Sequence, residues 1–167
     1  HSFILPDRSL IAKLDKTPNL LKLDAASRIL WVNNEMIWHH SLQPSIDGQV
    51  WTCGSDLPTD AGKPSVGRRV VNLNGHKVSY QEDHIVKIDV GSGKILFRKG
   101  VGEILVENGM AGRLYGGLLQ DPIHLNDVSP VMTDGPYWKR GDLFVSVRGR
   151  SMVLLYRPSE NRVLRVV

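Results

Sequence analysis

The stretch GDLFVSVRGRSMVLLYR, residues 141–157, decides the fold. It holds two short apolar runs, Leu143–Val147 and Met152–Arg157, and a third run, Arg162–Val166, follows after a polar turn. Short runs bounded by turn residues are typical of antiparallel β-strands. Similar runs recur upstream, and we expect further strands at Ser2–Leu5, Leu10–Lys13, Leu20–Asp24, Ile29–Val32, His40–Pro44, Val50–Cys53, His84–Asp89 and Ile95–Arg98.

Helix signals are weak along the whole chain. Only Val101–Asn108, which is closed by Gly109, predicts a helix, and it would span barely two turns. Two stretches interrupt the strand pattern. Gly54–Gln81 is polar and rich in glycine and proline, so we expect a long loop there, and Met110–Pro122 is glycine-rich and predicts a connection.

Composition excludes several classes of protein. Of the 167 residues, 41% are hydrophobic and 23% charged, which does not fit a disordered, collagen-like or coiled-coil chain. The sequence contains no apolar run of the roughly 18 residues that a membrane-spanning helix needs. The net charge of +4 comes from scattered lysines and arginines, so nucleic-acid binding is not predicted.

The chain has a single cysteine, Cys53. One cysteine excludes a disulfide within the chain and a multi-cysteine zinc site. We expect Cys53 to be a small buried hydrophobic residue, with pairing to a cysteine outside this chain as the alternative.

An internal repeat organises the chain into three segments, which begin with His1, His40 and His124. Each segment runs through four strands, the first of them in the third segment at His124–Val128, and we divide the chain into units 1–36, 37–100 and 122–167 with a connection at 101–121. Four antiparallel strands in a repeated unit predict the blades of a β-propeller, because a single blade buries its faces only against its neighbours. We therefore expect an all-β chain of about three blades.

The repeat also predicts where particular side chains lie. The recurrent histidine should begin the innermost strand of its blade and point toward the axial channel. The aromatic residues Trp31 and Phe97 should pack in the seams between blades. His76 and His84 lie outside the repeated position, and we expect each to be an ordinary surface or hydrogen-bonded residue.

The third unit resembles the aryl-sulfate sulfotransferase (ASST) family. The motifs are HLND at 124–127, DGPYWKRGDLFVSVR at 134–148 and LYRP at 155–158; WHHS at 38–41 and DGQVW at 47–51 support them. The resemblance implies a six-bladed propeller that transfers a sulfuryl group from a phenolic sulfate ester to a phenol, without a nucleotide sulfate donor or a cofactor. It also implies a histidine that is transiently sulfated in a ping-pong cycle, and export to the periplasm or attachment to a membrane.

The resemblance also assigns candidate site residues. His124 and His40 match channel histidines, Arg148 follows the family's Ser-x-Arg pattern, and Asn126 belongs to the HxN element. An arginine can bind two sulfate oxygens with its planar fork, so we expect Arg148 to lie across from His124 and clamp the sulfate. Arg150 remains an alternative if a bulge shifts the register.

Strand alternation separates the remaining polar candidates. Asn126 should face the same side as His124, where it binds sulfate, orients a side chain or satisfies a buried backbone group. His39 should point to the opposite face from His40, so the pair is not expected to share a metal ion without a bulge. We predict no metal site.

The histidine that attacks sulfur belongs, in the family, to a later blade than the one with the HxND and SxR elements. No histidine follows His124, so we expect the nucleophile beyond Val167 and regard the chain as an incomplete piece that is inactive alone. His124 is the nucleophile only if the repeats are misplaced. The competing hypothesis is a non-catalytic propeller used for binding or scaffolding, because the segment KIDVGSGKILF at 87–97 also resembles quinoprotein-like propellers.

Overall fold

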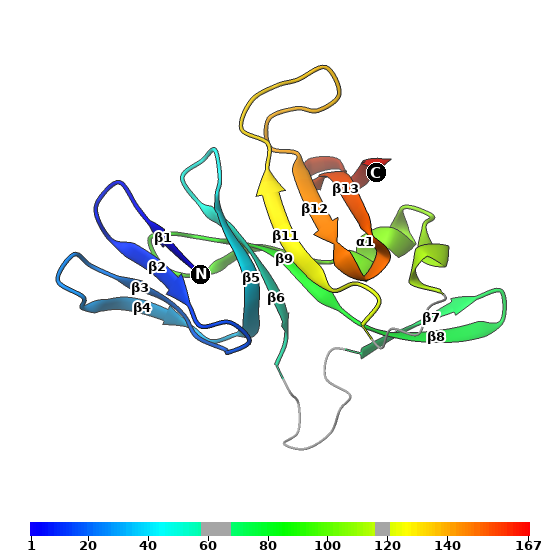
Figure 1. Cartoon of the computed structure of the whole chain (residues 1–167), viewed down its shortest axis with the longest axis horizontal. Coiled ribbons are helices and arrows are strands. Elements are labelled where there is room, and N and C mark those ends of the chain that lie inside the picture. The colour runs from blue at the N-terminus through cyan, green and yellow to red at the C-terminus, as the bar shows by residue number, and fades with distance from the viewer. Residues whose placement is uncertain (58–67, 116–120) are drawn as a thin grey trace.

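The computed structural model describes residues 1–57, 68–115 and 121–167 (Figure 1). Over these residues the chain forms fourteen strands in four antiparallel sheets, together with one α-helix. The first sheet has the order β1-β2-β3-β4. Its strands are β1 (Ser2–Ile4), β2 (Leu10–Lys13), β3 (Leu20–Leu23) and β4 (Ile29–Asn33).

The second and third sheets each have four strands as well. The second sheet has the order β10-β9-β6-β5 and is built from β5 (Met36–Pro44), β6 (Val50–Asp56), β9 (Asp83–Ile88) and β10 (Ile95–Gly100). The third has the order β11-β12-β13-β14 and is built from β11 (Leu125–Pro130), β12 (Leu143–Val147), β13 (Met152–Arg157) and β14 (Arg162–Val166). The bounds of β12, β13 and β14 are those predicted from the sequence.

The three larger sheets lie side by side, with the second between the other two (Figure 1). Strand β11 contacts β5 and β6, and β1 contacts β5. One apolar core joins the first sheet to the second through Ile11, Leu20, Trp38 and Ile88. The other joins the second to the third through Ile85, Leu125, Val145 and Leu154. Each sheet therefore buries a face against its neighbour.

Trp31 lies in the seam between the first two sheets. Its indole Nε1 donates to the carbonyl of Val90 at 3.1 Å, and its ring covers Gly93, where a Cβ would stand only 2.6 Å from the ring. Phe97 packs against the second core and meets Trp51 edge-on, with ring centroids 5.5 Å apart. Both aromatic residues thus pack where the repeat predicted.

The predicted loop over Gly54–Gln81 is wrong for its second half. Strands β7 (Arg68–Leu73) and β8 (His76–Gln81) form a hairpin that projects from the second sheet (Figure 1). Asn74 and Gly75 make its turn, with φ of 50° and 87°, and this dipeptide is a strong hairpin signal. Positions 58–67 lie outside the described residues.

The predicted helix is present as α1 (Val101–Glu107). Its N-terminus is capped by a residue from outside the helix: the buried Glu82 carboxylate accepts the Gly102 N–H at 2.8 Å. The connection that follows contains a 3₁₀ turn at Ala111–Leu114, and 116–120 lie outside the described residues. Within the described ranges, no helix is both long enough and apolar enough to cross a membrane.

Strand β5 starts earlier than predicted and contains an irregularity. His39 pairs with Cys53 and Leu42 pairs with Thr52, which leaves His40 and Ser41 without partners in the ladder. The prediction that His40 begins this strand is wrong, because the strand begins at Met36 and His40 lies at a bulge in its middle.

Candidate functional site

His40 has a backbone conformation that is uncommon for a residue with a side chain. Its φ is +53°, in the left-handed region, and its N–H donates to the Asp15 carboxylate at 3.0 Å. Asp15 lies in the β2–β3 connection of the first sheet. A neighbouring sheet therefore supports the backbone that sets the direction of the His40 imidazole.

His124 repeats this arrangement at the start of β11. Its φ is +43°, and its N–H donates to the Asp121 carboxylate at 2.8 Å. The same carboxylate lies 3.0 Å from the ring Nδ1 of His124. Asp121 thus holds both the backbone and the ring of this histidine.

The structure brings both histidines and Arg148 together. The imidazole centroids of His40 and His124 are 5.5 Å apart, and Nη1 of Arg148 lies 3.3 Å from Nε2 of His124. Arg148 stands in a 3₁₀ turn just after β12, where its N–H donates to the carbonyl of His124 at 3.1 Å. Arg150 instead donates to the carbonyl of Leu114 at 2.9 Å. Of the two candidate arginines, Arg148 is therefore the one at the histidines.

The contacts of His124 fix its tautomer. A guanidinium can only donate, so Nε2 of His124 accepts from Arg148. The proton of a neutral ring must then reside on Nδ1, where Asp121 accepts it. In this state both ring nitrogens are engaged, one by a cation and one by a carboxylate.

His39 lies on the same side as His40, and the prediction that the two point apart is wrong. Their rings meet edge-on with centroids 5.2 Å apart, and both line one cavity. The bulge at His40 breaks the alternation on which the prediction rested. Nε2 of His39 lies 3.4 Å from a carboxylate oxygen of the buried Asp83, which also accepts the Leu125 N–H at 2.9 Å.

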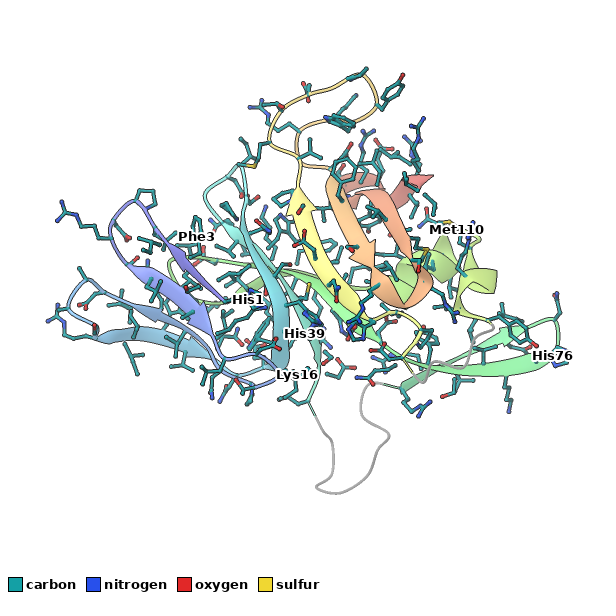
Figure 2. All side chains as sticks on the ribbon, in the orientation of Figure 1. His1, Phe3, Lys16, His39, His76 and Met110 are labelled. Atoms are coloured by element: carbon teal, nitrogen blue, oxygen red, sulfur yellow. The ribbon has the colours of Figure 1, made fainter. Side chains whose placement is uncertain are left out.

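The cavity at the histidines has a volume of about 330 Å³. Figure 2 shows Lys16 and His39 near each other at this part of the molecule. The lining residues come from the three larger sheets, their connections and the end of the β7–β8 hairpin: Lys16, Ile37, His39, His40, Ser55, Asp56, Gln81, Asp83, Asp121 and His124. One of the carboxylates, that of Asp56, is paired with Arg69 and Arg98.

Asn126 lies in a different hollow from His124. It lines a second depression together with His1, His40 and Gln43, and the cavity described above does not include it. The prediction that Asn126 faces the same side as His124 is wrong, because the register of β11 shifts between Leu125 and Asp127. Among the described residues, no hydrogen-bond partner reaches its buried Oδ1. His40 borders both hollows.

The electrostatics of the site favour neutral imidazole at His40. Its pKa is lowered, first by partial burial and then by the neighbouring His39, against the opposing effect of the Asp15 carboxylate. In the described parts of the chain, no group of three or more His, Cys, Asp or Glu side chains is arranged to hold a metal ion.

Cys53 is not among the residues that line the cavity. Its thiol is fully buried 3.4 Å from the Ser41 hydroxyl, and burial raises the pKa of the thiol to about 12. A thiol in such surroundings is inert, as expected for a small buried hydrophobic residue.

Comparison with known proteins identifies a family for the chain. Curated proteins and solved structures give no match to the chain. The sequence model of the family described as Arylsulfotransferase (ASST) matches residues 2–167, which is almost the entire chain. The protein therefore belongs to the arylsulfotransferase (ASST) family.

Proposed function

We propose that the protein transfers a sulfuryl group from a phenolic sulfate ester to a phenol. The observation that carries the proposal is the convergence of His40, His124 and Arg148 at one place, from three separate segments of the chain. Family membership supports an aryl substrate. The residues supply cationic and neutral hydrogen-bonding groups, which match the charge that develops on sulfuryl oxygens during transfer.

Arg148 and His124 have binding roles in this proposal. The guanidinium is always charged and offers several donors, so it stabilises the sulfuryl oxygens. Both ring nitrogens of His124 are already engaged, by Arg148 and by Asp121, which favours a role in holding the group over a role in attacking sulfur. Asn126 offers its amide from the neighbouring hollow beside His40.

The proposed cycle has two half-reactions. In the first, a histidine nitrogen attacks sulfur, an N–S bond forms, and the aryl O–S bond breaks to release the phenol after protonation. In the second, the acceptor phenol loses its proton and attacks the same sulfur, which releases the histidine. In this proposal the sulfated imidazole belongs to a histidine other than His124, because both ring nitrogens of His124 are engaged. His40, whose pKa is lowered, is available in its neutral form to exchange protons with the phenols.

The architecture proposed is a β-propeller with the three larger sheets as blades. The side-by-side sheets and the contacts of β1 and β11 with β5 support it, because neighbouring blades meet at their inner strands. A periplasmic or otherwise exported location is proposed on the family resemblance alone.

Turnover of 4-nitrophenyl sulfate by the full-length protein tests the function. We expect release of 4-nitrophenol that depends on an added phenol, yields an equal amount of the sulfated acceptor, and needs no nucleotide sulfate. Release at the buffer rate would overturn the proposal and leave a non-catalytic propeller as the better reading. Release independent of the acceptor would also overturn it, because that result describes a hydrolase.

A further inference from the structure

Lys13 is a buried lysine with an unusual set of partners. It lies on β2 of the first sheet, and only 3% of its surface is exposed. Its ammonium donates to the carbonyls of His39 and Ser41, the latter at 3.0 Å, and to the hydroxyl of Thr52 at 3.2 Å. None of the described carboxylates lies within ion-pair distance of it. The ammonium is therefore held by neutral oxygens of the second sheet.

These oxygens belong to the bulge that carries His40. The two carbonyls flank His40 on either side, and the ladder between β5 and β6 skips from His39 to Leu42 at this point. A buried carbonyl that leaves a ladder needs another donor, or the bulge would be unfavourable. The Lys13 ammonium meets that need for the Ser41 carbonyl, to which the Thr52 hydroxyl also donates at 2.8 Å, and it binds the His39 carbonyl on the other side of His40 as well.

A lysine is a costly choice for a purely structural contact. Burial lowers the pKa of Lys13 to about 8, so the surroundings disfavour its charge. An apolar residue in a regular, unbulged strand pair would avoid that cost. The arrangement instead supports the left-handed backbone of His40. This backbone places the His40 ring beside the ring of His124.

We propose that Lys13 is a positioning residue for His40: by binding the carbonyls on both sides of the bulge, it holds the imidazole in the cavity. The inference rests on the proposed function for its catalytic consequence. Its structural consequence, a fixed environment of the His40 ring, can be measured without any substrate.

The test compares Lys13→Met with a matched control, Lys22→Met. Lys22 is a second buried lysine of the same sheet, on β3, and its ammonium lies 3.6 Å from Asp7, away from the bulge. Both variants are made in the full-length protein. The imidazole NMR signals of His40 are followed through a pH titration, and kcat and KM are measured with 4-nitrophenyl sulfate and phenol.

For Lys13→Met we expect the His40 signals to move, its pKa to rise toward the usual 6.5, and kcat to fall at least about tenfold with KM changed less. For Lys22→Met we expect both readouts to stay as in the wild type, even if the protein unfolds more easily. A folded Lys13→Met variant with unchanged His40 signals would overturn the proposal. So would shifted signals with wild-type kcat.

Thr52→Val provides a second route if Lys13→Met does not fold. Valine has nearly the shape of threonine but removes one partner of Lys13 and one donor to the bulge. We expect a smaller His40 shift in the same direction, and no shift would count against the proposal. Should the wild type not transfer sulfuryl groups at all, the proposed function fails, whereas the titration of His40 still decides the positioning role.

Discussion

Arg148 and His124 are joined by both backbone and side chain: the Arg148 N–H donates to the His124 carbonyl at 3.1 Å, and its guanidinium lies 3.3 Å from the ring. The backbone bond ties the turn after β12 to the start of β11. The backbone of Arg148 therefore stays beside His124 while the end of the third sheet is intact. Because the backbone bond does not depend on the side chain, replacing Arg148 should show its effect in activity more than in stability.

For Arg148→Ala we predict a fall in kcat/KM of about 10²–10³-fold, since one preorganised donor to developing charge is lost. Arg148→Lys should recover only part of the rate, because lysine keeps the charge and loses the planar fork. The measurement is turnover of 4-nitrophenyl sulfate. Arg165→Ala is the matched control, since Arg165 is exposed on β14 of the same sheet and its guanidinium lies 5.0 Å from the Tyr137 ring. Equal rates for Arg148→Ala and this control would remove Arg148 from the site.

For Asp121→Asn we predict a fall in kcat of about tenfold or more. The amide places donors where the carboxylate accepts both the N–H and the ring Nδ1 of His124, so the ring loses its fixed tautomer. The ¹⁵N shifts of the His124 imidazole should report a changed tautomer. Asp134→Asn, which alters a carboxylate that accepts the Arg140 N–H at 2.7 Å, should change neither quantity. An Asp121→Asn variant in which His124 keeps its wild-type tautomer would contradict the role given to Asp121.

For Gly149→Ala we predict a loss of about 1–3 kcal/mol in the free energy of unfolding together with reduced kcat. A Cβ at this position would stand 2.5 Å from the carbonyl oxygen of Pro122, and backbone atoms cannot swing aside as a flexible side chain does. Pro122 leads directly into His124, so the strain reaches the site. Gly112→Ala is the control, because a Cβ there meets nothing within 4 Å. Chemical denaturation and turnover of both variants check the prediction. It fails if Gly149→Ala and Gly112→Ala have the same free energy of unfolding and the same kcat.

The buried Glu82 predicts a pH dependence of stability. Burial raises the pKa of its carboxyl from 4.5 to about 7, while the unfolded chain keeps the ordinary value. Between these values the folded state binds more protons, so this group's stabilisation is full below pH 4.5 and is lost as the pH rises through 7. The loss is at most about 3–4 kcal/mol.

Urea denaturation at several pH values, compared between the wild type and Glu82→Gln, measures that contribution. Glutamine keeps an acceptor for the Gly102 N–H but does not titrate. The curve of the variant should be flatter than that of the wild type between pH 4.5 and 7. Parallel curves would show that Glu82 has no raised pKa in the folded protein.

The local pattern of the sequence predicted three strands of the third sheet, β12, β13 and β14, and the helix. Strands such as β12 are short, bounded by turn residues and buried on one face in alternation, which is what the sequence pattern reports. The β7–β8 hairpin was missed although its Asn74-Gly75 turn is a strong local signal. The surrounding polar residues hid the weak alternation of its strands.

The site was predicted only in part, because its geometry depends on contacts between sheets. The motifs pointed to His124 and Arg148, which the structure places in contact. Strand alternation misplaced His39 and Asn126, since bulges near His40 and Asn126 reverse the faces. Asp121 and Lys13 carry no motif. Their roles arise from hydrogen bonds to backbone atoms, which a sequence pattern does not record.

At both His40 and His124 the backbone is left-handed, so stability and the function of the site favour different residues at these positions. A side chain at positive φ costs about 1–2 kcal/mol relative to glycine, which adopts this conformation freely. Selection for heat resistance alone, in nature or in a laboratory screen, would therefore tend to replace these two histidines with glycine. Their retention in any homologue is evidence of continued use, and engineering for thermal resistance should hold both positions fixed.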